Sequence, residues 1–361
     1  MAYRYRKFGN FLVPLEQSIS DVVRIFLFGY ARHRLDSLGL SRSAARKIVI
    51  VAFINRFRRP NTSLQVTLSV VAHLGMQVHR GYKLFDFDRS EVTKVFNAEV
   101  SAQSTDHEIS ASRTASKVSS APRFLGADPD ARWFTEEYIR GVRATTLVTA
   151  GASDYQRFYA DAERCLLDLA GCRPATKISL RSHVDTKADS PFRERWTKGG
   201  ASSEEVDHVD GYIAKLRAWL LANAEADVLQ LVLTHGDFSL VNAIAADGGL
   251  RFIDWESIAP GGVYSDIYNF VLVESYYERT TPDFVAEAQA ILERYKLALS
   301  DAHPALAAAS EIKLRFARRL YYLERMRFLL DREVTANLRQ VTSKSIALFR
   351  RFDAELGDSP I

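Results

Sequence analysis

Cysteine and long apolar runs are nearly absent from this sequence of 361 residues. The two cysteines, Cys165 and Cys172, imply no disulfide framework, and no Cys/His spacing typical of a metal site accompanies them. No stretch approaches 18 uncharged apolar residues, so we expect no membrane-spanning helix. The N-terminus also lacks the apolar core and cleavage site of a signal peptide. These absences favour a cytoplasmic protein with reduced thiols.

A strong overall charge is also absent, since the net charge is only +4, but the distribution is uneven. Residues 1–60 hold 12 Lys and Arg against 3 Asp and Glu, a net charge of +9, which leaves −5 for the remainder. Helical spacing predicts amphipathic helices at 18–30 and 41–59, the second ended by Pro60. Two interpretations stay open for this basic segment.

The first interpretation is a helical platform with solvated arginines. The second is a surface for anionic partners, such as a membrane interface or an acidic glycolipid. Nucleic acid is disfavoured as a partner, because no recognised nucleic-acid motif accompanies the charge.

The most informative stretch runs from residue 231 to 256. An apolar run stops at His235-Gly236-Asp237, Asn242 follows five residues after the aspartate, and a second apolar run delivers Asp254. Two carboxylates and an amide at the ends of β-like runs suit Mg²⁺ and a reacting oxygen. The alternative, that these are turn and strand-end residues, explains neither the fixed five-residue step nor the paired strands.

The pattern His-Gly-Asp-x4-Asn followed by Ile-Asp-Trp-Glu resembles the aminoglycoside phosphotransferase and choline kinase-like families, relatives of the protein kinases. The resemblance implies an α+β, two-lobed protein kinase-like fold. A small antiparallel β lobe at 78–140 would bind the nucleotide, and a larger, mostly helical lobe at 141–361 would carry catalysis and acceptor binding. Residues 1–77 would form an extra basic, helical N-terminal extension.

The resemblance also implies roles for individual residues. Asp237 would accept or orient the proton of the acceptor hydroxyl, while Asn242 and Asp254 would bind Mg²⁺. His235 and Asp266 would give structural support to the catalytic loop. Trp255-Glu256 replaces the Phe-Gly that protein kinases carry after the metal-binding aspartate, so no glycine-enabled flip is expected.

Alternation along 81–88 and 91–96, with a turn between them, predicts a hairpin that carries Lys94 on its second strand. By resemblance Lys94 would anchor the phosphates, although a solvated strand lysine is the plainer alternative. Glu108, in a helical stretch, is the candidate ion-pair partner of Lys94, with Glu99 as an alternative. No G-x-G-x-x-G precedes the hairpin, so the phosphate-covering loop stays unlocated.

Two further strands are predicted at 123–128 and 132–139. By resemblance, backbone groups of Glu137, Tyr138 and Ile139 would hold the adenine. An ordinary strand leading into a loop would have the same sequence.

Beyond Gly141 the chain is mostly helical. Helices are predicted at 155–169, 209–226 and 305–332, and the polar stretch 181–205 is interpreted as a mobile insertion or a short-helix segment. The arginines of 305–332 are most simply a solvated face, with contact to a substrate phosphate as the alternative. They are Arg315, Arg318, Arg319, Arg325 and Arg327.

These observations predict a phosphotransferase that uses ATP, or GTP as the alternative, and Mg²⁺. It would move the γ-phosphate to a hydroxyl of a small molecule or a sugar, including a lipid-linked or polysaccharide sugar. Peripheral contact with the inner face of the membrane through the basic helices is the alternative to a purely cytoplasmic location. The alternative function is a catalytically silent kinase-like module that binds a nucleotide or a partner.

Overall fold

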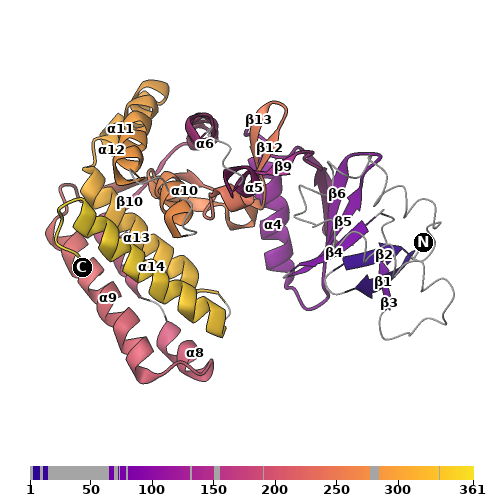
Figure 1. Ribbon diagram of the computed structural model, residues 1–361, viewed down its shortest axis with the longest axis horizontal. Coiled ribbons are helices and arrows are strands. Elements are labelled where there is room, and N and C mark those ends of the chain that lie inside the picture. Colours follow the sequence, from indigo (N-terminus) through magenta and orange to yellow (C-terminus); the bar gives the residue numbers. More distant parts are fainter. Residues whose placement is uncertain are drawn as a thin grey trace. The chain divides into compact units, whose positions relative to one another are not determined.

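The computed structural model describes most of the chain, and its elements fall into two compact units (Figure 1). The first unit comprises 1–154 and 240–257, and the second comprises 155–239 and 258–361. The residues described are 3–8, 11–14, 65–68, 72, 74–78, 80–130, 132–149, 155–189, 191–276, 284–332 and 334–361. This division has no boundary at 77 or at 140, because one unit runs from residue 1 to 154, and this unit also takes in the segment 240–257.

An eight-stranded antiparallel sheet dominates the first unit, with the strand order β3-β1-β2-β4-β5-β6-β8-β7. Its strands are β1 (Tyr3–Phe8), β2 (Phe11–Pro14), β3 (Gln65–Leu68), β4 (Leu74–Val78), β5 (Gly81–Asp86), β6 (Glu91–Phe96), β7 (Phe124–Asp128) and β8 (Trp133–Glu137). The predicted hairpin and the two later strands are therefore present.

The strands β1 to β4 correct the prediction of a helical extension over 1–77 at the residues that they occupy. The missed signal is the alternation of aromatic and basic residues in Tyr-Arg-Tyr-Arg-Lys-Phe at 3–8, which has the period of a strand. β1 pairs with β2 and β3, and β2 pairs with β4, so both ends of the 1–77 segment join the sheet. The helices predicted at 18–30 and 41–59 lie outside the described residues.

The hairpin of β5 and β6 fixes the register of the sheet next to the candidate site. Ser90 closes its turn with a left-handed φ of 56°, and Lys83 pairs directly with Lys94. At the start of β5 only glycine fits, because a Cβ at Gly81 would lie 1.9 Å from the carbonyl oxygen of Val95.

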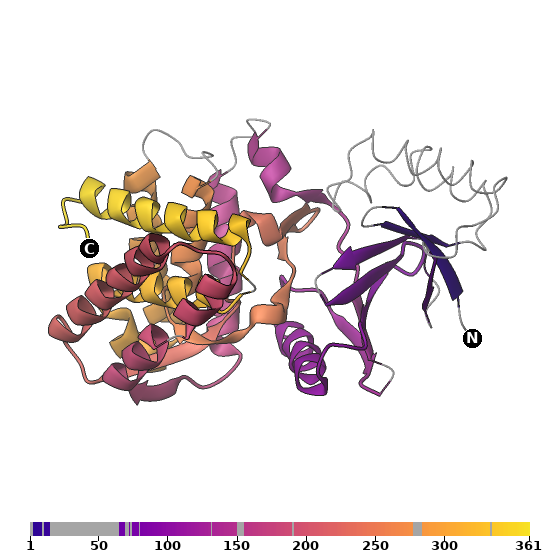
Figure 2. The same cartoon turned by 90° about the horizontal axis from the view of Figure 1, so that it is seen from below.

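Helix α4 (Ala102–Ala115) lies against one face of this sheet (Figure 2). Its N-terminus is capped by Ser101, whose hydroxyl accepts a hydrogen bond from the Ser104 amide at 3.2 Å. Ile109 packs with Phe96 and Phe134. Glu108, the neighbour of Ile109 on the helix, is therefore buried at the sheet as well.

A second, three-stranded sheet completes the first unit, with the order β13-β12-β9. Its strands β9 (Val142–Arg143), β12 (Ala243–Ala246) and β13 (Gly249–Phe252) are accompanied by α5 (Ala144–Thr149) and the short 3-10 helices η2 (Leu240–Asn242) and η3 (Trp255–Ser257). The hairpin of β12 and β13 carries the residues predicted to bind metal.

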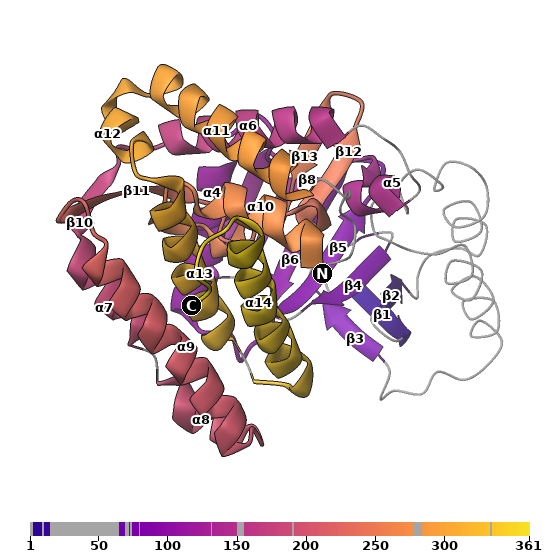
Figure 3. The same cartoon turned by 60° about the vertical axis from the view of Figure 1, so that its left-hand side comes forward.

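The second unit is mostly helical, with a small sheet of order β10-β11-β14. Its strands are β10 (Thr176–Ser179), β11 (Val228–Thr234) and β14 (Ala259–Gly262). Its helices are α6 (Tyr155–Gly171), α7 (Leu180–Ala188), α8 (Phe192–Lys198), α9 (Ser203–Ala222), α10 (Ser265–Tyr276), α11 (Phe284–Ala302), η4 (Pro304–Leu306), α12 (Ala307–Ser310), α13 (Leu314–Leu330) and α14 (Ala336–Glu355). Helix α13 packs against α7, α9, α10 and α14 (Figure 3). No described helix is long and apolar enough to cross a membrane.

Two predictions for this unit need correction. The helix predicted over 305–332 is interrupted, because α12 ends at Ser310 and Lys313 has an extended backbone with ψ of 131° before α13 begins. The arginines of α13 are also not one solvated face. Arg318 and Arg319 are buried, and both bind the buried carboxylate of Asp353.

The polar stretch 181–205 adopts the short-helix form, as α7, α8 and the start of α9. It is anchored by Phe192 and Trp196, whose rings are buried and lie edge to face. Ser202 and Glu205 form a reciprocal capping box at the start of α9.

Candidate functional site

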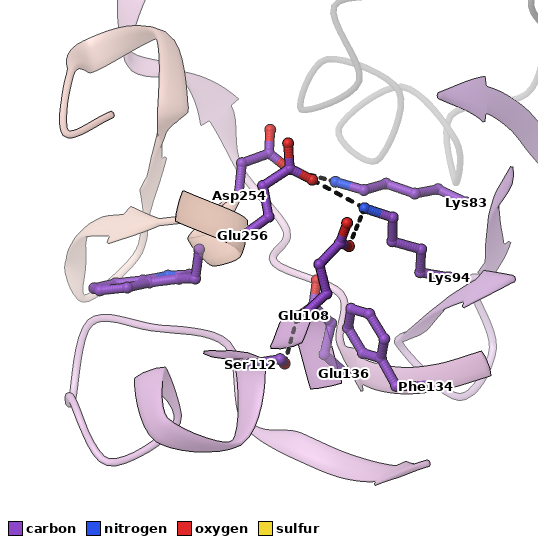
Figure 4. Close-up of a pocket in the computed structure, with 9 residues that line it drawn as sticks. Lys83, Lys94, Glu108, Ser112, Phe134, Glu136, Asp254 and Glu256 are labelled. Atoms are coloured by element: carbon purple, nitrogen blue, oxygen red, sulfur yellow. Dashed lines mark hydrogen bonds and ion pairs between the residues drawn. The ribbon is translucent and has the colours of Figure 1, made fainter. Parts of the chain in front are cut away.

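Two lysines from neighbouring strands enter one pocket of the first unit (Figure 4). Lys83 on β5 and Lys94 on β6 occupy directly paired positions, so both side chains leave the same face of the sheet. The pocket encloses an empty volume of about 310 Å³, part of it open to solvent. Its walls also hold Glu108 and Ser112 of α4, Phe134 and Glu136 of β8, and Asp254, Trp255 and Glu256.

Lys94 and Glu108 form an ion pair, which is the partnership predicted from the sequence. The side chains are 6% and 1% exposed, so the pair is shielded from water. Glu108 also accepts a hydrogen bond from Arg80 at 3.0 Å, and the Lys94 ammonium lies 5.5 Å from the centre of the Phe96 ring. Glu99, the alternative partner, is exposed. The solvated alternative for Lys94 is thereby excluded.

Asp254 ends the second apolar run in an unusual backbone conformation, with a φ of 63°. Left-handed backbone is uncommon for a residue other than glycine and costs about 1–3 kcal/mol, and such residues cluster at functional sites as well as in tight turns. The carboxylate is 39% exposed and forms an ion pair with Lys83. Two residues further on, Glu256 binds Lys94 at 3.0 Å.

Asn242 and Asp254 lie at the same end of the β12–β13 hairpin. The last registered pair is Ala243 with Phe252, and the Asn242 carbonyl accepts a further hydrogen bond from the Ile253 amide at 2.9 Å. Strand pairing thus brings the backbones of Asn242 and Asp254, the two residues predicted to bind metal, to the same end of the hairpin, although they are twelve positions apart in the sequence.

The carboxylates and lysines of the pocket shift each other's pKa values. Burial would lower the pKa of Lys83, but the Asp254 and Glu136 carboxylates outweigh it and raise that pKa. Burial raises the pKa of Glu136, which accepts a hydrogen bond from the Ser112 hydroxyl. For Glu256, the attraction of Lys94 overcomes burial and lowers the pKa. Lys83 is therefore set among carboxylates that favour its charged form.

The predicted adenine-binding stretch, 137–139, lies at the end of β8, directly after the pocket residue Glu136. The Glu137 amide donates to the Arg123 carbonyl at 2.9 Å, and the Tyr138 amide donates to the Ser90 carbonyl at 2.8 Å. The Glu137 carboxylate binds Arg251 at 3.1 Å. Because these two amides are already engaged, an adenine contact by an amide of this stretch would fall to Ile139.

The His-Gly-Asp turn belongs to the second unit, where β11 leads into it. Asp266, near the start of α10, accepts hydrogen bonds from the His235 amide at 2.6 Å and the Gly236 amide at 3.0 Å. The buried His235 ring accepts from the Asp237 amide through Nδ1 at 3.3 Å. Burial raises the pKa of Asp266 to about 6, against the lowering influence of His235 and the two amides. The structure thus brings His235 and Asp266 to the backbone that carries Asp237.

Asp237 has a cationic neighbour that the sequence did not indicate. Arg325 of α13 donates a hydrogen bond to its carboxylate at 3.0 Å, and the two side chains are 14% and 27% exposed. Burial would raise the pKa of Asp237, but the charge and hydrogen bond of Arg325, with help from His235 and Arg332, hold it below the usual value. The guanidinium groups of Arg325 and Arg332 both lie over the Phe328 ring, 4.8 and 4.7 Å from its centre.

Sequence reasoning missed four residues of these two clusters: Lys83, Glu136, Glu256 and Arg325. Of these residues, only Lys83 could have been predicted from the sequence. A hairpin with a four-residue turn between Asp86 and Glu91 places Lys83 opposite Lys94. The others come from β8, η3 and α13, and no local pattern marks them.

Comparison with known proteins fits this geometry. A model of the phosphotransferase enzyme family (APH) matches residues 80–342. The chain belongs to this family. It is accordingly a phosphotransferase with an alcohol group as acceptor. No curated protein matches the chain in sequence.

Solved structures place the chain in the kinase-like fold. A choline kinase from Cryptosporidium parvum is 13% identical, with a TM-score of 0.53 over 79% of this chain and 91% of that one. A glucosamine kinase in complex with glucosamine, ADP and inorganic phosphate is 14% identical, with a TM-score of 0.50 over 78% of each chain. At these identities the likeness establishes the α+β kinase-like fold, as predicted from the sequence.

Proposed function

We propose that this member of the family transfers the γ-phosphate of ATP, with Mg²⁺, to a hydroxyl of a small molecule or a sugar. The observation that carries the proposal is the shielded Lys94–Glu108 ion pair in the pocket that also holds Asp254. Phosphoryl transfer depends on such a positioned cation and on a metal-binding acid, because charge on the transferred group must be stabilised.

The residues at the end of the β12–β13 hairpin suit Mg²⁺. The ion takes oxygen ligands and is usually held by one or two carboxylates together with substrate phosphates. Asn242 and Asp254 provide an amide and a partly exposed carboxylate. Among the described residues no group of three or more His, Cys, Asp and Glu could hold a metal by itself, so phosphate oxygens would complete the coordination. When bound, Mg²⁺ would neutralise charge on the β- and γ-phosphates.

Lys94 would bind the phosphates through its ammonium, oriented by Glu108. The Glu256 carboxylate, which binds Lys94 at 3.0 Å, would give way to the phosphates because it is 40% exposed and free to turn into solvent. Backbone groups of Glu137, Tyr138 and Ile139 would hold the purine, with GTP as the alternative to ATP.

Asp237 would take the proton of the acceptor hydroxyl. His235 and Asp266 would keep its backbone in place through the hydrogen bonds to this turn. Arg325 would keep the carboxylate ionised and ready to accept a proton. A loose transition state asks for positioning rather than a strong base, so a low pKa is compatible with this role.

The described surroundings of Asp237 favour an uncharged or anionic acceptor. Arg325 and Arg332 would repel a polycationic compound such as an aminoglycoside. A sugar, including a lipid-linked or polysaccharide sugar, is therefore our proposed acceptor class. Membrane contact through the basic segment 18–59 would suit a lipid-linked sugar. Co-sedimentation of the full chain with anionic vesicles at low salt tests that contact, and absence of binding would remove it.

The ion pairs on Asp237 and Asp254 also favour a second candidate, a catalytically silent module in which internal cations occupy both acids. One experiment separates the two functions. The chain is incubated with Mg²⁺ and γ-labelled ATP across a panel of neutral sugars, sugar acids, amino alcohols and antibiotics. Label transfer to an acceptor supports the kinase, whereas nucleotide binding with no transfer to any acceptor supports the silent module.

A further inference from the structure

Lys83 is the one cation of the pocket that the proposed function leaves without a role. It lies directly across from Lys94 in the β5–β6 hairpin. Like charges in directly opposed positions of a sheet destabilise it, so this arrangement needs compensation. The compensation comes from carboxylates at the pocket wall, and it differs for the two lysines.

Lys94 pairs with Glu108, to which the proposed function assigns no other role. Lys83 pairs with Asp254, which the proposed function also assigns to the metal. Glu108 is 1% exposed and stays with Lys94 and Arg80. The ion-pair partner of Lys83 in the described part of the chain is Asp254, which is 39% exposed and is our proposed metal ligand. When Mg²⁺ binds Asp254, the Lys83 ammonium loses this partner while its side chain stays 20% exposed in the pocket.

The displaced ammonium would keep Glu136 as a carboxylate neighbour but would lose its ion-pair partner, so a further anion would stabilise this largely shielded charge. The only anion that arrives together with Mg²⁺ is the polyphosphate of the nucleotide. We propose that Lys83 is a second phosphate-binding lysine, which rests on Asp254 in the nucleotide-free protein and moves to the polyphosphate when Mg²⁺ and the nucleotide bind. The proposal rests on the proposed function, since it takes Asp254 as the metal ligand.

The remaining contacts of the pocket fit the same exchange of partners. In the nucleotide-free arrangement Glu256 binds Lys94 as Asp254 binds Lys83, so each lysine has one partly exposed carboxylate in front of it (Figure 4). The phosphates would displace Glu256 and the metal would displace Lys83. The two lysines would then face the polyphosphate side by side.

Binding measurements on the full chain test this role without requiring an acceptor. Titration calorimetry would give the Kd of ADP with Mg²⁺ and the Kd of adenosine for wild type, Lys83→Met and Lys83→Arg. Lys117→Met is the matched control, because Lys117 is an exposed lysine of the same unit, outside the pocket.

We expect Lys83→Met to raise the Kd of Mg²⁺–ADP by about 10- to 100-fold, the loss of one charge-assisted hydrogen bond. The Kd of adenosine should not change, because adenosine carries no phosphate. Lys83→Arg should restore most of the affinity, and Lys117→Met should match wild type.

Other results would overturn the proposal. An unchanged or lower Kd of Mg²⁺–ADP in Lys83→Met would show that Lys83 only occupies Asp254 and competes with the metal. An equal loss of adenosine affinity would assign Lys83 a purely structural role. If wild type bound Mg²⁺–ADP normally in either case, the phosphotransferase proposal would stand and this inference alone would fail. If wild type bound no nucleotide, both would fail.

Discussion

The ion pair between Arg325 and Asp237 makes a sharp prediction about the pH dependence of the reaction. The perturbation is Arg325→Met, which keeps an unbranched apolar side chain and removes the guanidinium with its charge. In wild type, burial would raise the pKa of Asp237, and Arg325, with smaller help from His235 and Arg332, more than reverses this effect. Without the guanidinium the effect of burial remains, so the pKa of Asp237 must rise.

The size of the effect follows from the geometry. The guanidinium nitrogen lies 3.0 Å from the carboxylate oxygen, and both side chains are largely shielded from solvent. An opposite charge at such a distance shifts the pKa of a carboxyl group by about 1 to 3 pH units. Asp237 accepts a proton only when it is ionised, so the acid limb of the kcat/KM profile should move to higher pH by about that amount.

The assay is phosphate release or transfer from γ-labelled ATP between pH 4 and 9, with the acceptor found in the panel or with water in its place. The wild-type pKa of Asp237 is held below the usual 3.8, so the wild-type profile should show no acid limb in this range, whereas the variant should show one. Arg351→Met serves as the control, because Arg351 is an exposed arginine of α14 that pairs with Glu355. It should leave the profile unchanged. If Arg325→Met folds normally and its acid limb coincides with that of wild type, Asp237 is not the group that must be ionised.

Three further predictions concern stability and nucleotide binding. Glu108→Gln should lower the free energy of unfolding by about 3 kcal/mol, because it leaves Lys94 charged and shielded without its buried partner. The same change should weaken ATP binding. Denaturant unfolding measures the first effect and calorimetry the second, and an unchanged Kd of ATP would contradict the phosphate role of Lys94. The folded-state pKa of Asp266, about 6, lies above its ordinary 3.8, so its contribution to stability is complete below about pH 4 and is lost as the pH rises through 6. That loss is about 3 kcal/mol at 1.36 kcal/mol per pH unit, and Asp266→Asn should remove this share of the pH dependence of unfolding; an identical pH dependence would refute it. Gly81→Ala should lower the free energy of unfolding by more than about 1 kcal/mol, because its Cβ would meet the Val95 carbonyl; an unchanged thermal midpoint would contradict this.

Local pattern was sufficient where each residue's environment is set by its neighbours in sequence. The alternation of apolar and polar residues along 81–88 and 91–96 predicted the β5–β6 hairpin, and therefore predicted that Lys94 lies on a strand. The apolar runs before Asp237 and Asp254 gave the strands that deliver them. The pattern also offered Glu108 as a candidate partner of Lys94, with Glu99 left open, and the packing of α4 decides between them.

Local pattern was insufficient where tertiary contacts decide. Arg318 and Arg319 look like members of a solvated helix face, but α14 brings Asp353 to them and they are buried. The pairing of Arg325 with Asp237 spans 88 residues and depends on how α13 packs. The first strand was missed for another reason. Residues 3–8 were included in the basic helical extension predicted over 1–77, although the alternation of aromatic and basic residues at 3–6 has the period of a strand.

The most direct test of the central claim is Mg²⁺-dependent transfer of label from γ-labelled ATP to a hydroxyl acceptor by wild type, Asp237→Asn and Asp254→Asn. We predict transfer by wild type that chelation of Mg²⁺ abolishes. Both variants should fold and lose at least about 100-fold in rate, since each lacks a carboxylate that the reaction requires. Full activity in either folded variant, or transfer that continues without a divalent metal, would contradict the account.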